Sequence, residues 1–158
     1  MLELSALLKE YQKKCEKRLE KALLQFQGHG PLSDALAYAL TSNGKRFRPS
    51  LVGMLNKALQ CPWSLDDLSL STEFFHTASL IADDLPCMDN DALRRGKLST
   101  HKKFGESTAI LAGNSLLTMA FEILSKENFN ITHKSKLKLI NHIAKCSGHT
   151  GIAGGQYL

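Results

Sequence analysis

The segment from residue 83 to residue 96 constrains this sequence most, because it places acidic and basic groups side by side. It reads Asp-Asp-Leu-Pro-Cys-Met-Asp-Asn-Asp-Ala-Leu-Arg-Arg-Gly and follows an apolar run from Phe74 to Ala82. Pro86 disfavours helical geometry at the residue before it, so we expect a helix that ends at about Asp84. The carboxyl end of a helix attracts cations. The segment therefore predicts a cation site at the end of an apolar helix.

The side chains of this segment match those that bind a metal and a diphosphate. Asp83, Asp84 and Asp89 offer carboxylate oxygens, and Mg²⁺ is usually held by one or two carboxylates together with substrate phosphate oxygens. Arg94 and Arg95 can each bind phosphate through a bidentate guanidinium. The alternatives are a solvated acidic loop and a calcium site of the EF-hand type. Against calcium, the sixth position lacks the glycine and the twelfth lacks the glutamate of an EF-hand.

A second basic cluster lies upstream, in Gly-Lys-Arg-Phe-Arg-Pro at residues 44–49. Lys45, Arg46 and Arg48 precede Pro49, a residue favoured at the first helical position. Backbone N–H groups, the helix dipole and three cations would then converge on one anion site. The alternative is an exposed loop with ordinary surface cations.

These motifs resemble those of the trans-prenyltransferases, the polyprenyl diphosphate synthase family that includes farnesyl and geranylgeranyl diphosphate synthases. Residues 44–49, residues 76–106 and Gly154-Gly155-Gln156 occur in the family's order. The four-residue spacer between the aspartate pair and the third aspartate is most similar to the geranylgeranyl type. The resemblance runs from about Ser33 to Leu158 and covers the amino-terminal half of such an enzyme. The family's second aspartate-rich motif is absent from this sequence.

The resemblance implies a Mg²⁺-dependent prenyl transfer by ionisation, condensation and elimination, in which isopentenyl diphosphate is joined to an allylic diphosphate. It assigns the metal to Asp83, Asp84 and Asp89, and it makes Asp83, Asp84 and Arg94 the catalytic groups. The substrate-binding residues that it implies are Lys45, Arg48, His76, Arg94, Arg95 and Gln156. For His76 the alternative is a satisfied core residue.

The resemblance also implies a pocket that sets product length. In the family, bulky residues at the fifth and fourth positions before the first aspartate stop chain growth, and here these positions hold Ala78 and Ser79. Small side chains would leave the pocket open to a longer tail. Phe75, one turn further from the aspartates, could then end growth near twenty carbons, as in a geranylgeranyl diphosphate synthase. The alternative for Phe75 is plain core packing.

The hydrophobic periodicity predicts an all-α fold. Apolar residues recur at three- and four-residue intervals from Leu2 to Leu23, which is typical of an amphipathic helix. The nearly uncharged stretch 107–125 predicts a helix buried inside a bundle. We expect residues 97–103 to form a basic loop, and no useful β-alternation is present. With the resemblance, this predicts an antiparallel helix bundle of the isoprenoid synthase type, with residues 1–158 as the amino-terminal part of one domain.

Charge and cysteine usage exclude some other classes. The net charge is +5, but basic residues are scattered among acidic ones, and the aspartates would repel a phosphate backbone, so we expect no nucleic-acid partner. The cysteines lack close pairing, which indicates free thiols in a reducing compartment. The amino terminus has no apolar signal region, and residues 107–121 are too polar for a transmembrane segment. We therefore expect a cytoplasmic location.

Two functions remain open on the sequence. The first is a prenyltransferase, a homodimer by expectation, of which these residues alone would be inactive. The alternative is a non-catalytic partner or regulatory subunit that binds diphosphates or pairs with a complete synthase.

Overall fold

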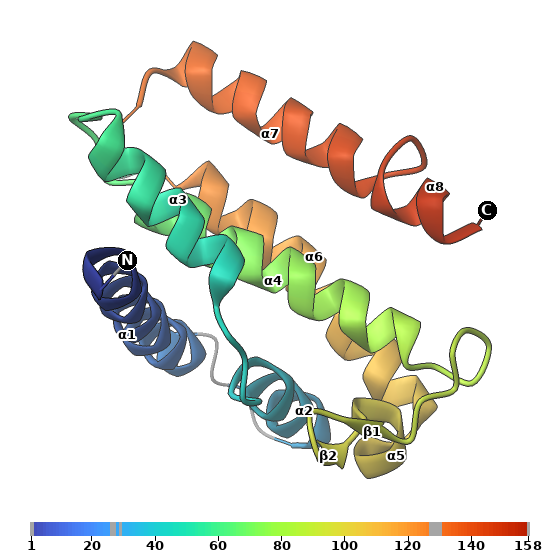
Figure 1. Ribbon diagram of the computed structural model, residues 1–158. Coiled ribbons are helices and arrows are strands. Elements are labelled where there is room, and N and C mark those ends of the chain that lie inside the picture. The colour runs from blue at the N-terminus through green and yellow to red at the C-terminus, as the bar shows by residue number, and fades with distance from the viewer. Residues whose placement is uncertain (1, 26–27, 29, 127–130, 158) are drawn as a thin grey trace.

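The computed structural model describes residues 2–25, 28, 30–126 and 131–157, and within them the fold is all-α with one short β-hairpin (Figure 1). The all-α prediction is confirmed. In chain order the elements are α1 (Leu2–Gln25), α2 (Pro31–Leu40), α3 (Phe47–Ala58), α4 (Asp66–Asp83), β1 (Leu93–Arg94), β2 (Lys97–Leu98), α5 (Thr100–Phe104), α6 (Glu106–Ser125), α7 (His133–Ser147) and α8 (Ile152–Tyr157).

Helices α4 and α6 lie side by side at the centre of the bundle and form its largest helix contact (Figure 1). Their facing sides hold the core, in which Phe74 of α4 and Leu116 of α6 are fully buried. Burying one such side chain stabilises a fold by about 1.5–3 kcal/mol. Ala78 lies at the same contact, where its carbonyl faces the small residue Gly113 of α6. These small residues let the two helices approach closely.

Helix α1 packs against α3 and α4 through a buried stripe that includes Cys15 and Leu19, as the apolar periodicity predicted. Burial raises the pKa of the Cys15 thiol to about 12. The four cysteines, Cys15, Cys61, Cys87 and Cys146, are free, which confirms the prediction of free thiols.

Helix α6 differs from the prediction of a helix buried on all sides. Its residues Ile110, Leu111 and Leu117 are exposed, while the opposite side packs on α2 and α4. Within the described ranges, α6 is also the one helix whose length and composition would suit a membrane span. A core helix meets the same criteria, and the packing of α6 against α2 and α4 accounts for the apolar character of its buried side.

The prediction of a basic loop at residues 97–103 is wrong. Residues 93–98 form the antiparallel hairpin β1–β2, and residues 100–104 form α5. The two turn residues, Arg95 and Gly96, both have positive φ, 56° and 78°. Positive φ at both central residues is the requirement of the tight turn that best suits the twist of a two-stranded hairpin. The turn therefore holds Arg95 in a fixed place.

Candidate active site

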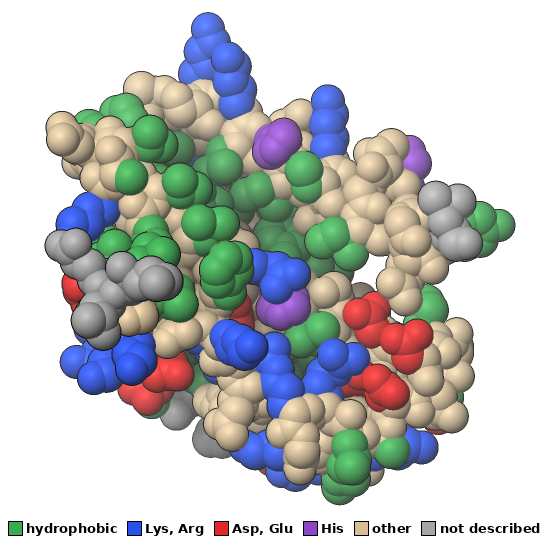
Figure 2. Space-filling model, in the orientation of Figure 1, with side chains coloured by type: hydrophobic (Ala, Val, Ile, Leu, Met, Phe, Trp, Pro, Cys, Tyr) green, Lys and Arg blue, Asp and Glu red, His purple; other side chains and the backbone are tan. Residues whose placement is uncertain are grey.

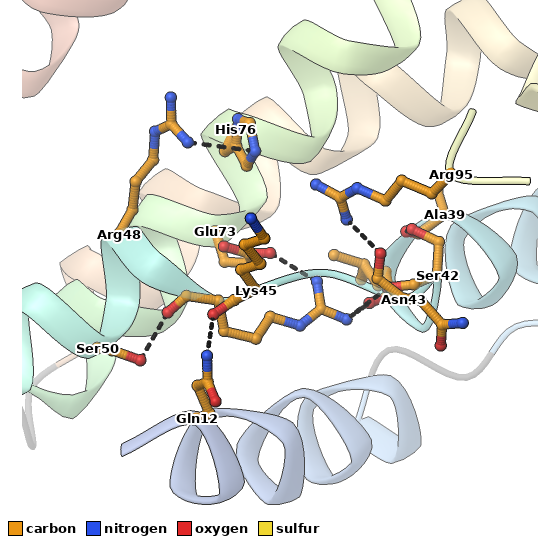
Figure 3. A network of polar contacts seen from close by, with 12 residues as sticks. Gln12, Ala39, Ser42, Asn43, Lys45, Arg48, Ser50, Glu73, His76 and Arg95 are labelled. Atoms are coloured by element: carbon orange, nitrogen blue, oxygen red, sulfur yellow. Dashed lines mark hydrogen bonds and ion pairs between the residues drawn. The ribbon is translucent and has the colours of Figure 1, made fainter. Parts of the chain in front are cut away.

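A cavity of about 510 Å³ opens between the α2–α3 loop, α4 and the hairpin turn. We call it the basic cavity. It brings together four residues that the sequence predicted to bind substrate, namely Lys45, Arg48, His76 and Arg95 (Figure 3). In Figure 2, Lys and Arg side chains gather around a His side chain on this face, with Asp and Glu side chains beside them.

His76 comes from α4 and meets Arg48 from the first turn of α3. The Nη1 atom of Arg48 lies 3.3 Å from Nε2 of His76. Burial lowers the pKa of His76, and the nearby positive charge of Arg48 lowers it further. A guanidinium has no acceptor, so this contact is a hydrogen bond when Nε2 is the unprotonated nitrogen. The positive charge of the cavity therefore resides on its lysine and arginines.

Arg95 reaches the cavity from the hairpin turn. Its Nη1 atom donates to the backbone carbonyl of Asn43 at 3.0 Å. A Cβ atom added at Gly44 would lie 2.5 Å from Nη1 of Arg95 and 3.0 Å from Nη1 of Arg46. Glycine at this position therefore leaves room for two guanidinium groups beside the loop.

Arg46 does not join the other cations of its cluster in the way that the sequence predicted. Helix α3 begins at Phe47, two residues before Pro49, and Arg46 precedes it with a φ of 44°. The Arg46 side chain is buried and forms an ion pair with Glu73 of α4. Two cations of the cluster, Lys45 and Arg48, remain exposed.

The aspartate segment, residues 83–91, follows the end of α4. Helix α4 ends at Asp83 with Asp84 as its last capping residue, as Pro86 predicted. Asp84 is buried and accepts a hydrogen bond of 2.6 Å from Nε of Arg94, and Nη2 of Arg94 lies 2.5 Å from the same oxygen. This contact raises the pKa of Arg94. Arg94 is therefore already paired with a carboxylate of the chain itself, that of Asp84.

The backbones of Asp83 and Asp89 meet just after the end of α4. The backbone N–H of Asp89 donates to the carbonyl of Asp83 at 2.9 Å. Burial raises the pKa of Asp83, Arg94 lowers it, and the charges of Asp89 and Asp84 raise it again. Within the described ranges, no three His, Cys, Asp or Glu side chains are grouped to hold a metal. The predicted metal site therefore rests on the sequence motif, in which Asp83, Asp84 and Asp89 supply carboxylates of the kind that Mg²⁺ takes together with phosphate oxygens.

A second cavity, of about 240 Å³, lies between α4 and α7. Phe75 and Ser79, two of the predicted chain-length residues, line it, and Arg48 and His76 line both cavities. We call it the apolar cavity, because Phe75, Leu68, Ile143 and Ile152 form much of its wall. Its remaining lining residues are Thr72, His142, Cys146 and Ser147. The ring of Phe75 meets that of Phe121 edge to face, with centroids 5.2 Å apart. The two cavities are therefore neighbours that share two residues.

Two predicted site residues lie apart from these cavities. Ala78 is buried in the α4–α6 core and is not among the residues that line the apolar cavity. Gln156 lies on α8 with an exposed side chain and lines neither cavity. Their predicted roles therefore rest on the sequence motifs.

The sequence analysis missed the residues that support the basic cavity. Glu73 pairs with Arg46, and Gln12 of α1 donates to the Lys45 carbonyl at 2.5 Å. A sequence signal existed for Glu73, since this carboxylate directly precedes Phe74 and Phe75 in a helix that the core buries. No local pattern marked Gln12, because its contact joins residues far apart in the chain.

The family model of polyprenyl synthetase matches residues 29–158. This chain belongs to the polyprenyl synthetase family. The resemblance inferred from the three motifs is therefore confirmed. The match begins just before α2 and includes both cavities and the aspartate segment.

Curated relatives and solved structures agree with this assignment. The chain is 41% identical over 157 residues to a farnesyl diphosphate synthase of Geobacillus stearothermophilus, covering 98% of this chain and 53% of that protein. It is 43% identical over 130 residues to geranylgeranyl pyrophosphate synthase 4 of Arabidopsis thaliana, covering 80% and 32%. A geranyltransferase structure from Legionella pneumophila superposes with a TM-score of 0.92 at 36% identity, over 98% of this chain and 55% of that one. The chain thus spans about half the length of the farnesyl synthases that it matches.

Proposed function

We propose that this chain supplies the amino-terminal half of a prenyltransferase active site, as part of a single isoprenoid synthase domain. The reaction is the condensation of isopentenyl diphosphate with an allylic diphosphate. The observation that carries the proposal is the basic cavity. It gathers Lys45, Arg48, His76 and Arg95 from four places in the fold, namely the α2–α3 loop, α3, α4 and the hairpin turn. Four groups that can donate to phosphate oxygens, next to an apolar cavity, suit a substrate with a charged head and an apolar tail.

In this proposal the basic cavity binds the diphosphate of isopentenyl diphosphate. Arg48 and Arg95 can donate two hydrogen bonds each to phosphate oxygens, and Lys45 adds a point charge. His76 lies at the boundary with the apolar cavity and so orients the substrate between the two. The isopentenyl group then faces away from the cations.

The aspartate segment serves the allylic diphosphate. Asp83, Asp84 and Asp89 are the residues that would hold Mg²⁺, with Arg94 beside them. When bound, Mg²⁺ would supply Lewis-acid polarisation of the diphosphate oxygens and neutralise their charge. Phe75 and Ser79 line the cavity for the allylic tail and exclude water from the reacting carbons. Gln156 would contact substrate from α8.

The family names leave the product length open, because the relatives include both farnesyl and geranylgeranyl synthases. The small Ser79 and the floor residue Phe75 favour a product near twenty carbons. In this proposal Ala78 affects product length through the position of α4, because it does not line the apolar cavity. A cytoplasmic location and a homodimer, both expected from the sequence, remain predictions.

The test is a prenyl-transfer assay with labelled isopentenyl diphosphate, farnesyl diphosphate and Mg²⁺. It compares the 158-residue chain with the same chain extended by the second half of a farnesyl diphosphate synthase. We expect a twenty-carbon product from the extended chain and none from the 158 residues alone. Absence of product from both, with both folded, would contradict the proposal.

One observation favours a second candidate, a non-catalytic partner that pairs with a complete synthase. Helix α6 exposes Ile110, Leu111 and Leu117, so an apolar surface is available for association. This candidate predicts that adding the chain to a complete synthase changes the synthase's rate, while the extended chain stays inactive.

A further inference from the structure

Arg46 and Glu73 form a buried ion pair in the wall of the basic cavity. Nη1 of Arg46 donates to Oε1 of Glu73 at 2.6 Å, and the two side chains are 4% and 3% exposed. Taking two charges out of water is costly unless further hydrogen bonds satisfy them. The site must therefore hold the pair in a well-defined geometry.

Arg46 connects four parts of the chain. Its Nη2 atom donates to the carbonyls of Leu40, at the end of α2, and of Ser42 in the following loop, at 2.7 and 3.0 Å. Its own carbonyl accepts from the hydroxyl of Ser50 in α3 at 2.6 Å. With Glu73 on α4, these contacts tie the end of α2, the loop, α3 and α4 together at one residue.

The backbone at Arg46 shows that these contacts determine the loop conformation. Its φ of 44° lies in the left-handed region, which is strained for a residue with a Cβ atom. Such a conformation persists only where the surroundings impose it. The buried contacts of the Arg46 side chain supply that constraint.

The residues that Arg46 and Glu73 hold are those that face the cavity. Lys45 precedes Arg46, Arg48 follows it by two residues, and both side chains are exposed. Glu73 lies three residues before His76, so the two share one face of α4. The carbonyl of Lys45 is held from the other side by Gln12 of α1.

We propose that Arg46 and Glu73 are positioning residues, which set the cavity-facing geometry of Lys45, Arg48 and His76 through the ion pair that they form with each other. The inference rests on the proposed function, because it takes isopentenyl diphosphate as the ligand of the basic cavity. An ion pair of this kind contributes geometry more than stability, since apolar replacement of a buried pair is often neutral for stability. Stability and binding can therefore be separated by experiment.

The test variant is Arg46→Met with Glu73→Leu, which removes both charges together and leaves neither unpaired. The matched control is Arg18→Met with Asp66→Leu, which removes an arginine–carboxylate pair between α1 and α4 that lies outside the basic cavity. Circular dichroism and urea unfolding monitor the fold. Calorimetry measures the dissociation constant for isopentenyl diphosphate, and the extended chain gives the KM for each substrate.

We expect the test variant to fold and to raise the dissociation constant and the KM for isopentenyl diphosphate at least tenfold. The allylic KM should change less than twofold, and the control should match the original chain in both. A folded test variant with unchanged binding would overturn the proposal. If the test variant does not fold, Arg46→Lys decides. Arg46 serves its acceptors from two separate nitrogens, Nη1 and Nη2, whereas the three N–H groups of an ammonium radiate from one nitrogen. A folded Arg46→Lys variant should bind several times more weakly, and unchanged binding would overturn the proposal.

A ligand-free measurement separates this inference from the proposed function. The ¹⁵N resonances of the His76 imidazole and the Arg48 guanidinium report the positioning directly. They should shift in the test variant, or in Arg46→Lys if that variant is used, but not in the control. If the original chain fails to bind isopentenyl diphosphate, the proposed function fails. Shifted resonances would then still support positioning, and unshifted ones would overturn it.

Discussion

Two ion pairs show how the basic cavity and the aspartate segment differ. In the basic cavity, Arg46 and Glu73 are both buried, at 4% and 3% exposure. In the aspartate segment, Asp84 is equally buried at 3%, but its partner Arg94 is 30% exposed. The first pair is sealed within the fold, whereas the arginine of the second remains accessible to a ligand.

The difference indicates how far this chain builds each half of the site by itself. The basic cavity has its cations in place and its supporting contacts made within the described residues. In the aspartate segment, Asp83 and Asp89 adjoin each other, but Arg94 is occupied by Asp84. Arg94 would have to exchange or share Asp84 to bind a diphosphate. We therefore expect the basic cavity to bind ligand without metal and the aspartate segment to require Mg²⁺.

The largest predicted loss of turnover comes from a substitution in the aspartate segment. Asp83→Asn keeps the size of the side chain and removes its charge. Loss of one electrostatic contact to the reacting group lowers turnover on the order of 10²–10³-fold. In the extended chain we expect a loss of at least this size, while binding of isopentenyl diphosphate changes less than twofold. Asp34→Asn, an exposed residue of α2, is the control. Near-normal turnover of Asp83→Asn with Mg²⁺ would contradict the metal assignment.

The next largest predicted effect is a rise in the KM for isopentenyl diphosphate, caused by a substitution in the basic cavity. Arg48→Ala removes a charged donor, and a hydrogen bond of this kind is worth about 1.5–3 kcal/mol, or roughly 10–100-fold in affinity. We expect the KM for isopentenyl diphosphate to rise by this factor and the allylic KM by much less. Arg18→Ala, outside the cavity, should leave both near their original values. The reverse order of the two KM changes would break the division into two half-sites.

A third prediction separates the apolar cavity from the core beside it. Ser79→Phe fills the apolar cavity, so we expect the extended chain to make a shorter product, seen by chromatography. Ala78→Phe places the same ring in the α4–α6 core, where overpacking costs about 1–3 kcal/mol of unfolding free energy. Urea unfolding measures that loss. Unchanged product length in Ser79→Phe would remove this residue from the tail pocket.

The smallest effect is a titration shift at His76. Burial and Arg48 hold its pKa below the ordinary value of 6.5, so the unfolded chain binds more protons below that pH. Folding stability from this group is therefore present above pH 6.5 and is lost as pH falls through the lowered pKa. A bound diphosphate adds negative charge and should raise the pKa of His76, with proton uptake on binding. NMR titration with and without isopentenyl diphosphate measures this shift. An unchanged or lowered pKa of His76 would indicate that the diphosphate binds away from His76.

Local sequence signals predicted the elements whose causes are local. Pro86 marked the end of α4 correctly. The hairpin was missed because each strand has two residues, too few for an alternation to show. Its one local signal was the Arg95-Gly96 pair, which suits a tight turn.

The buried contacts that support the basic cavity could not be predicted from local sequence signals. Arg46 looked equivalent to Lys45 and Arg48, because all three lie in one basic cluster. Its burial depends on Glu73, 27 residues away. The exposed side of α6 was missed for a related reason, since composition shows that a helix is apolar but not which neighbours cover it. Both the burial of Arg46 and the exposure of one side of α6 depend on contacts with residues far away in the sequence.

We expect this chain by itself to contain a complete binding site for isopentenyl diphosphate. Calorimetric titration of the folded 158-residue chain with that ligand, in EDTA and again in Mg²⁺, tests it most directly. We predict saturable binding at one site in EDTA, little changed by Mg²⁺ and weakened by Arg48→Ala. Absence of binding, or binding that appears only with Mg²⁺ and persists in Arg48→Ala, would contradict the account.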